Sequence, residues 1–117
     1  MDVNAYFHRL GLEMPEEIVP DSALLRKLHL AHCTAVPYEN LDILRDIPTS
    51  LEADALFRKI VTEGRGGLCF ELNGSFGNLL RCLGYGVTDY AAIYWSTFVP
   101  ELSEERNILY FNLVKLS

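Results

Sequence analysis

The chain has 117 residues, half of them hydrophobic, and a formal net charge of −6. This length suffices for one domain with a modest core, and the hydrophobic content argues against a disordered chain. The acidic excess argues against nucleic acid or an anionic membrane surface as a partner. Because no apolar run has the length of a membrane span and no signal peptide is evident, we expect a cytoplasmic protein without a membrane partner.

The first part of the chain predicts three helices joined by short connectors. Residues 3–10 carry apolar side chains on one side and form the first helix. Asp21 or Ser22 can cap the second, which runs to about residue 35. The third covers residues 51–62, with a serine at the cap position and acidic residues in its first turn.

Two histidines, His29 and His32, lie one turn apart on the second predicted helix, directly before Cys33. Such a pair can begin a metal site. Since no third ligand converges on it in the sequence, we expect a packed, hydrogen-bonded histidine pair and no metal. The three cysteines are odd in number and lack a framework spacing, which suits a reducing compartment.

The segment V-P-Y-E-N-L at residues 36–41 must begin in an extended conformation, because proline disfavours a helical residue before it. If this loop faces Cys69, the ring of Tyr38 can line a pocket that accepts aromatic molecules. Alternatively, Tyr38 belongs to the core. Glu39 is a candidate ion partner for Arg65, and the alternative is that Glu39 caps the next turn.

A glycine-rich stretch, G-R-G-G at residues 64–67, changes into a helix where Cys69 stands. The glycines disfavour regular structure. From Leu68 onward, apolar residues at helical spacing predict an amphipathic helix that ends before Gly84. Cys69 therefore falls in the first turn, where free N–H groups and the helix dipole favour a thiolate. The alternative is a buried structural cysteine.

The neighbours of Cys69 have expected supporting roles. Gly66 and Gly67 leave room for a substrate or a second backbone to approach the sulfur. Glu71 points to another face of the helix and is expected to be a structural anchor, for example to Arg65. Asn73, one turn after Cys69, can hold the loop by hydrogen bonds.

After Gly84 the sequence pattern changes to that of strands. Branched and aromatic residues predict a strand from residue 87 to about residue 95, followed by a polar loop over 96–105. Residues 108–116 predict an antiparallel partner strand. The fold class is therefore α+β, with four helices followed by two strands. Unpaired strand edges make self-association an expected property.

The motifs named above resemble those of one enzyme family. R-G-G-L-C-F-E-L-N at residues 65–73 resembles the signature R-G-G-x-C-x-E-x-N of the arylamine N-acetyltransferases. V-P-Y-E-N is similar to the family's V-P-F-E-N, and Y-F-H-R-L-G at residues 6–11 is similar to its start. The resemblance implies a cysteine-protease-like arrangement. A helical domain, residues 1–84, carries the nucleophile, and residues 85–117 begin an incomplete antiparallel β-barrel.

The resemblance also implies a chemistry. Cys69 is expected to take the acetyl group of acetyl-CoA and pass it to an arylamine or hydrazine. No metal is implied. Two side chains are implied to form the substrate pocket, Tyr38 and Phe70. Six residues are implied to support the site structurally: Glu39, Arg65, Gly66, Gly67, Glu71 and Asn73.

The chain departs from the family after the cysteine. The family uses Cys, His and Asp in that order, with the His roughly forty residues past the Cys. Here no histidine follows His32, and the corresponding region reads E-R-N-I-L at residues 105–109. We therefore expect a truncated chain with little or no activity alone. The alternatives are a catalytically dead binding module or a redox sensor that uses Cys69 with Cys33 or Cys82.

Overall fold

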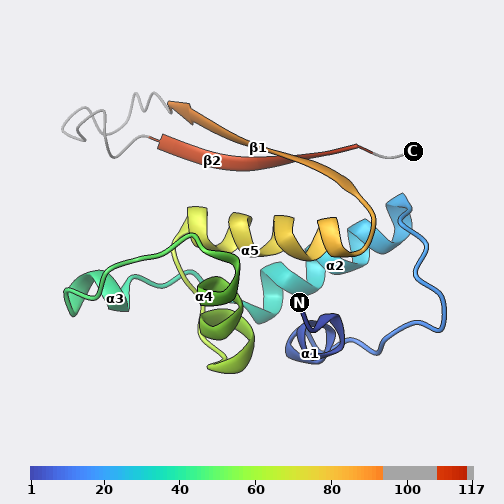
Figure 1. Ribbon diagram of the computed structural model, residues 1–117, viewed down its shortest axis with the longest axis horizontal. Coiled ribbons are helices and arrows are strands. Elements are labelled where there is room, and N and C mark those ends of the chain that lie inside the picture. The colour runs from blue at the N-terminus through green and yellow to red at the C-terminus, as the bar shows by residue number, and fades with distance from the viewer. Residues whose placement is uncertain (94–107, 116–117) are drawn as a thin grey trace.

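The computed structural model describes residues 1–93 and 108–115. Helices come first and a strand pair follows, as expected for an α+β chain (Figure 1). In chain order the elements are α1 (Val3–Arg9), α2 (Ser22–Ala35), α3 (Leu41–Leu44), α4 (Ala53–Phe57), the π-helix η1 (Arg58–Thr62), α5 (Cys69–Cys82), β1 (Gly86–Ile93) and β2 (Ile108–Lys115).

Helix α5 lies at the centre of this arrangement. The two strands pack along one side of it, and α1 and α4 contact it on the other (Figure 1). The strands pair antiparallel, with Gly86 opposite Lys115 and Ile93 opposite Ile108. The predicted hairpin is thus confirmed within the described residues, whereas residues 94–95, the loop 96–105 and residue 116 lie outside them. A barrel is not shown, because the described strands form one pair.

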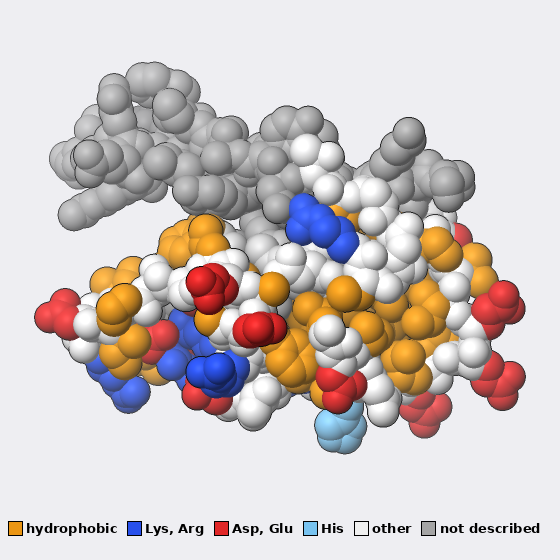
Figure 2. All heavy atoms as spheres, viewed as in Figure 1, with side chains coloured by type: hydrophobic (Ala, Val, Ile, Leu, Met, Phe, Trp, Pro, Cys, Tyr) orange, Lys and Arg blue, Asp and Glu red, His pale blue; other side chains and the backbone are white. Residues whose placement is uncertain are grey.

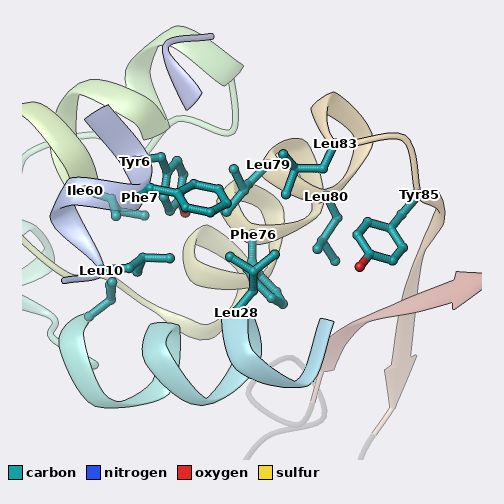
Figure 3. Close-up of a cluster of buried hydrophobic side chains, with 11 residues drawn as sticks. Tyr6, Phe7, Leu10, Leu28, Ile60, Phe76, Leu79, Leu80, Leu83 and Tyr85 are labelled. Atoms are coloured by element: carbon teal, nitrogen blue, oxygen red, sulfur yellow. The ribbon is translucent and has the colours of Figure 1, made fainter. Parts of the chain in front are cut away.

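The core forms where α1, α2 and α5 meet. Tyr6 and Phe7 of α1 point toward Leu79 of α5, and Leu28 of α2 points toward Phe76 (Figure 3). Burying a large apolar side chain contributes about 1.5–3 kcal/mol, so this cluster is the main source of stability for the helical part. The helical spacing of the apolar residues in α5 explains why one face of that helix enters the core.

The ends of the helices follow the predicted capping rules at most positions. The side chain of Asp21 accepts a hydrogen bond from the Leu24 N–H at 2.9 Å, which confirms one of the two predicted caps for α2. Gly84 follows the last turn of α5 with a φ of +101°, a left-handed conformation that favours glycine. The glycine therefore ends α5 as predicted.

The predicted helix over residues 51–62 differs in its start and its second half. It begins at Ala53 with Glu52 as N-cap, and Ser50 accepts a hydrogen bond from the Glu52 N–H instead of capping the helix. From Arg58 the turns widen into the π-helix η1. Its wider turn is closed by a hydrogen bond of 2.8 Å that the Glu63 N–H donates to the Arg58 carbonyl. A single π-turn of this kind often marks a functional region. Among the described helices, none is both long and apolar enough to cross a membrane.

Candidate active site

Cys69 is the first residue of α5 and is partly exposed. Its neighbour Leu68 is the N-cap, with an extended backbone and no side-chain oxygen to cap the first turn. A helix start leaves backbone N–H groups without helical partners, and the helix dipole there favours negative charge. The carboxylate of Glu71 accepts a hydrogen bond from the Leu68 N–H at 3.1 Å, which ties the cap residue to the first turn of the helix.

The glycine loop before Cys69 is bonded to the V-P-Y-E-N segment. The Glu39 N–H donates to the Gly67 carbonyl at 3.0 Å, and the Gly67 N–H donates to the Pro37 carbonyl at 3.2 Å. These bonds form a short parallel bridge between Tyr38 and Gly67. A Cβ at Gly66 would lie 1.7 Å from the Pro37 carbonyl oxygen. The glycine therefore allows the close approach of the Pro37 backbone to the loop.

Five charged residues join these segments. The predicted pair of Arg65 with Glu39 is present, and Arg65 Nη1 also lies 2.8 Å from Asp42 Oδ1. Lys59 Nζ lies 2.9 Å from Asp42 Oδ2 and 2.8 Å from Glu71 Oε2. We call Glu39, Asp42, Lys59, Arg65 and Glu71 the ion-pair network. Glu71 is the structural anchor expected, but the suggested partner Arg65 is wrong, because Lys59 holds its carboxylate.

The electrostatics of the network favour its ionised form. The hydrogen bond from Arg65 holds the pKa of Glu39 below its usual value, and the hydrogen bond from Lys59 does the same for Asp42. Burial lowers the pKa of Lys59, but its bonds to Glu71 and Asp42 outweigh this effect and raise the pKa overall. Four of these residues border an open cavity of about 290 Å³, so water reaches one side of the network and reduces its desolvation cost.

Two members of the network were missed by sequence reasoning, Asp42 and Lys59. Lys59 has a signal in the sequence, because it lies between Leu56 and Ile60 at helical spacing and therefore on an apolar face. A lysine at such a position needs a buried partner. Asp42 has no comparable signal, since it belongs to a helix of four residues.

Arg9 is a further residue that the sequence did not single out. Its guanidinium donates to the carbonyls of Ile60 and Ala35, both at 2.8 Å, and to those of Gly64 and Arg65 at 3.2 and 3.3 Å. The end of α1 is thereby fixed to the end of α2, to the middle of η1 and to the glycine loop. A guanidinium suits this position because it offers five donors in a fixed geometry.

Tyr38 is 67% exposed, so the alternative that it belongs to the core is wrong. Its side chain borders a pocket of about 270 Å³ between the end of α2 and the first turns of α5. Cys69 and Phe70 are not among the residues that line this pocket. The residues that line the pocket are His29, His32, Cys33, Val36, Tyr38, Leu72, Asn73 and Phe76.

The two histidines of α2 differ. His32 is buried and its Nε2 lies 3.0 Å from the Tyr6 hydroxyl, which in turn lies 2.7 Å from the Ser75 hydroxyl. Burial lowers the pKa of His32 to about 4 and raises that of Tyr6 to about 12. The expected packing thus holds for His32, whereas His29 is exposed, 3.9 Å from the Cys33 sulfur. In the part of the chain that the structure describes, no group of three or more His, Cys, Asp or Glu residues is placed to hold a metal.

Comparison with known proteins agrees with the arrangement of these motifs. The family described as N-acetyltransferase matches residues 21–114. The arylamine N-acetyltransferase / N-hydroxyarylamine O-acetyltransferase of Salmonella typhimurium is 46% identical over 85 residues, which are 73% of this chain and 30% of that protein.

Solved structures give the same result. The Salmonella typhimurium arylamine N-acetyltransferase structure superposes with a TM-score of 0.84 and 38% identity, covering 96% of this chain and 39% of that one. The Mycobacterium marinum enzyme in complex with CoA has a TM-score of 0.76 and 36% identity, covering 86% and 36%. The chain thus spans about 30% of the length of the curated relative given above. On its motifs, its α+β fold and these matches, the chain belongs to the arylamine N-acetyltransferase family.

Proposed function

We propose that Cys69 is the nucleophile of an acetyl-CoA-dependent arylamine N-acetyltransferase reaction. The observation that carries the proposal is the position of Cys69 at the first turn of α5, behind a glycine loop bonded to the V-P-Y-E-N segment. A thiol at such a helix start is favoured as thiolate, which is the reactive form. The relatives at this level of similarity are named for the same activity.

The proposed reaction has two steps. The Cys69 sulfur, as the thiolate, attacks the carbonyl carbon of acetyl-CoA, the new S–C bond forms, and the C–S bond to CoA breaks, so that CoA leaves as a thiolate and takes a proton from water. The amine nitrogen of the acceptor then attacks the acetyl-enzyme, the bond to Cys69 breaks and releases its thiolate, and the amine passes its proton to water. Backbone N–H groups at the start of α5, including that of Cys69, are the proposed donors to the oxyanion. Such an exchange gives ping-pong kinetics.

For the acceptor we propose an arylamine or a hydrazine, with Tyr38 and Phe70 as pocket side chains. The exposed ring of Tyr38 and its backbone bridge to Gly67, close to Cys69 in the chain, support this role for Tyr38. Phe70 directly follows Cys69 at the start of α5. The glycine loop, the ion-pair network and Asn73 are the proposed structural support of the site.

We also propose that this chain alone transfers little acetyl. A cysteine nucleophile needs a histidine within hydrogen-bond reach, and removing one member of such a triad abolishes most of the activity. The three histidines of the sequence, His8, His29 and His32, all precede Cys69. His32 is buried and bonded to Tyr6, so it is a poor base.

A chimaera tests the role of Cys69. Residues 1–93 replace the matching part of the Salmonella typhimurium enzyme, and acetyl-enzyme formation is followed by intact mass after addition of acetyl-CoA. We expect one acetyl group on Cys69, none in the Cys69→Ser variant, and an unchanged adduct in the matched control Cys33→Ser. A folded chimaera that acquires no acetyl group on Cys69 would contradict the proposal.

The same mass measurement on the 117-residue chain tests the need for a partner histidine. We expect no acetyl adduct within the time in which the chimaera is fully acetylated. An adduct on Cys69 that is absent in Cys69→Ser would show that the chain acts without the histidine. A disulfide between Cys69 and Cys33 or Cys82 under mild peroxide would instead favour the redox-sensor alternative.

A further inference from the structure

We propose that the buried carboxylate of Glu71, whose charge Lys59 neutralises, positions the Cys69 thiol by capping the first turn of α5. The proposal rests on Cys69 being the nucleophile, as argued above. Glu71 is the positioning residue in this view, because it acts on the thiol through the Leu68 N–H at the start of the helix.

The contacts form a continuous path to the nucleophile. Lys59 Nζ holds Glu71 Oε2 at 2.8 Å, and the other carboxylate oxygen of Glu71 accepts from the Leu68 N–H at 3.1 Å. Leu68 is the residue directly before Cys69 and cannot cap the helix itself. The orientation of the Glu71 carboxylate therefore decides where the helix begins, and with it the direction of the N–H groups around the sulfur.

Burial makes this arrangement stiff. Glu71 is 2% exposed and Lys59 is 9% exposed, so both side chains are held by packed neighbours on most sides. A carboxylate bonded to an ammonium group and to a backbone N–H has its rotamer fixed from both sides. Glu71 also lies against Gly67, where an added Cβ would come 3.1 Å from the Glu71 side chain. The Glu71 carboxylate thus restrains the positions of both the glycine loop and the first turn of α5.

The other end of the network reaches the V-P-Y-E-N segment. Lys59 also binds Asp42, Asp42 contacts Arg65, and Arg65 pairs with Glu39 in the V-P-Y-E-N segment. Buried ion pairs seldom stabilise a fold more than apolar residues of the same size. A buried carboxylate that ends at the N–H before Cys69 is therefore better explained by positioning than by stability.

Two matched double variants separate capping from charge. Lys59→Met/Glu71→Gln and Lys59→Met/Glu71→Leu both remove the two charges, but only the glutamine keeps an acceptor for the Leu68 N–H. Cys33 and Cys82 are exposed and are replaced by serine throughout, so that Cys69 is the single thiol. Lys27→Met, at an exposed lysine of α2, is the control for loss of a lysine.

The readouts are the rate of Cys69 alkylation by iodoacetamide near neutral pH and the hydrogen exchange of the Leu68 amide. We expect the glutamine variant to match the parent within about twofold. In the leucine variant we expect alkylation to slow about tenfold and Leu68 exchange to accelerate about tenfold. A role in stability alone would change the unfolding midpoint and leave the alkylation rate of the folded protein unchanged.

Equal alkylation rates and equal Leu68 exchange in two folded double variants would overturn the proposal. If the leucine variant does not fold, the glutamine variant still decides, because a folded glutamine variant with a tenfold slower Cys69 contradicts capping as the cause. Alkylation needs no acetyl-CoA, acceptor or histidine. Failure of this inference is therefore distinguishable from failure of the proposed acetyl transfer.

Discussion

Two polar clusters hold the helices of this protein, and they differ in chemistry. The ion-pair network joins α3, η1 and the glycine loop to the start of α5 through charges, beside an open cavity. The second cluster, Tyr6, His32 and Ser75, joins α1, α2 and the middle of α5 through neutral hydrogen bonds inside the core. The difference indicates that charge is concentrated around the glycine loop and the start of α5, whereas the core around α5 uses neutral groups that cost less to bury.

The largest expected effect comes from the loop that the network surrounds. Gly66→Ala would place a methyl group 1.7 Å from the Pro37 carbonyl oxygen, which only a shift of the backbone can relieve. We expect a loss of about 5 kcal/mol in the free energy of unfolding, measured by urea denaturation.

The matched control for the glycine is Gly74→Ala. There the added Cβ meets only a flexible Leu56 side chain, at 3.3 Å, within α5. We expect a change of about 1 kcal/mol or less. Similar losses in the two variants would mean that the close approach of Pro37 does not restrain the loop.

The second-largest expected effect on the free energy of unfolding comes from removing Lys59, the cation at the centre of the ion-pair network. Lys59→Met leaves the buried carboxylates of Asp42 and Glu71 without their shared partner. Removing one partner of a buried ion pair costs about 3–5 kcal/mol. Chemical denaturation of this variant beside Lys27→Met, for which we expect a change within about 0.5 kcal/mol, measures the difference. Equal losses of unfolding free energy in Lys59→Met and Lys27→Met would show that the ion-pair network does not stabilise the fold.

The two clusters are expected to lose their contribution to stability in different pH ranges. The folded pKa of His32 is about 4, below its unfolded value, so the unfolded chain binds the proton first. The stability that depends on neutral His32 is present above about pH 6.5 and is lost as the pH falls toward 4, by about 3 kcal/mol. The lowered pKa values of Glu39 and Asp42 put the loss from the network at lower pH, below the usual carboxylate range.

The variant His32→Gln checks this assignment, because it removes the titrating group from the core cluster. Between about pH 6.5 and pH 4.5 we expect its unfolding free energy to change much less than that of the parent chain. A parent chain whose stability stays flat across this interval would contradict the burial of a neutral His32.

The smallest expected effect is at the hydroxyl that joins the core cluster. Tyr6→Phe leaves His32 and Ser75 as buried polar groups without their common partner. We expect a loss of about 2 kcal/mol. Ser75→Ala added to Tyr6→Phe should cost less than the sum of the two single changes, because it removes one unpaired group, and a double-mutant cycle measures this coupling.

The sequence predicted the parts of the fold that depend on local spacing. The start of α2 at Asp21, the end of α5 before Gly84 and the hairpin of β1 and β2 all follow from capping, glycine and strand patterns. For residues 51–62 it predicted a helix but not the later start at Ala53 or the π-turn from Arg58. Short-range pattern rules do not include the packing of a segment against its neighbours.

For the candidate site, the pair of Glu39 and Arg65 was predicted, but the continuation through Asp42 and Lys59 was not. These two residues are distant in sequence and meet only after α3 and η1 are placed. Lys59 on an apolar face was the one available signal. No sequence signal indicated the four hydrogen bonds that Arg9 donates, because hydrogen bonds to backbone carbonyls of distant segments leave no pattern in the sequence.

The most direct test of the account is competitive alkylation of the three cysteines in the native chain. Cys33 and Cys82 are exposed and Cys69 is partly buried, so exposure alone predicts that Cys69 reacts last. The dipole and backbone N–H groups at the start of α5 favour negative charge on a reacting sulfur, which predicts that Cys69 reacts first, several-fold faster than the others, and that denaturing urea removes the difference. Slower labelling of Cys69 than of both exposed cysteines would contradict the claim that this helix start activates the thiol.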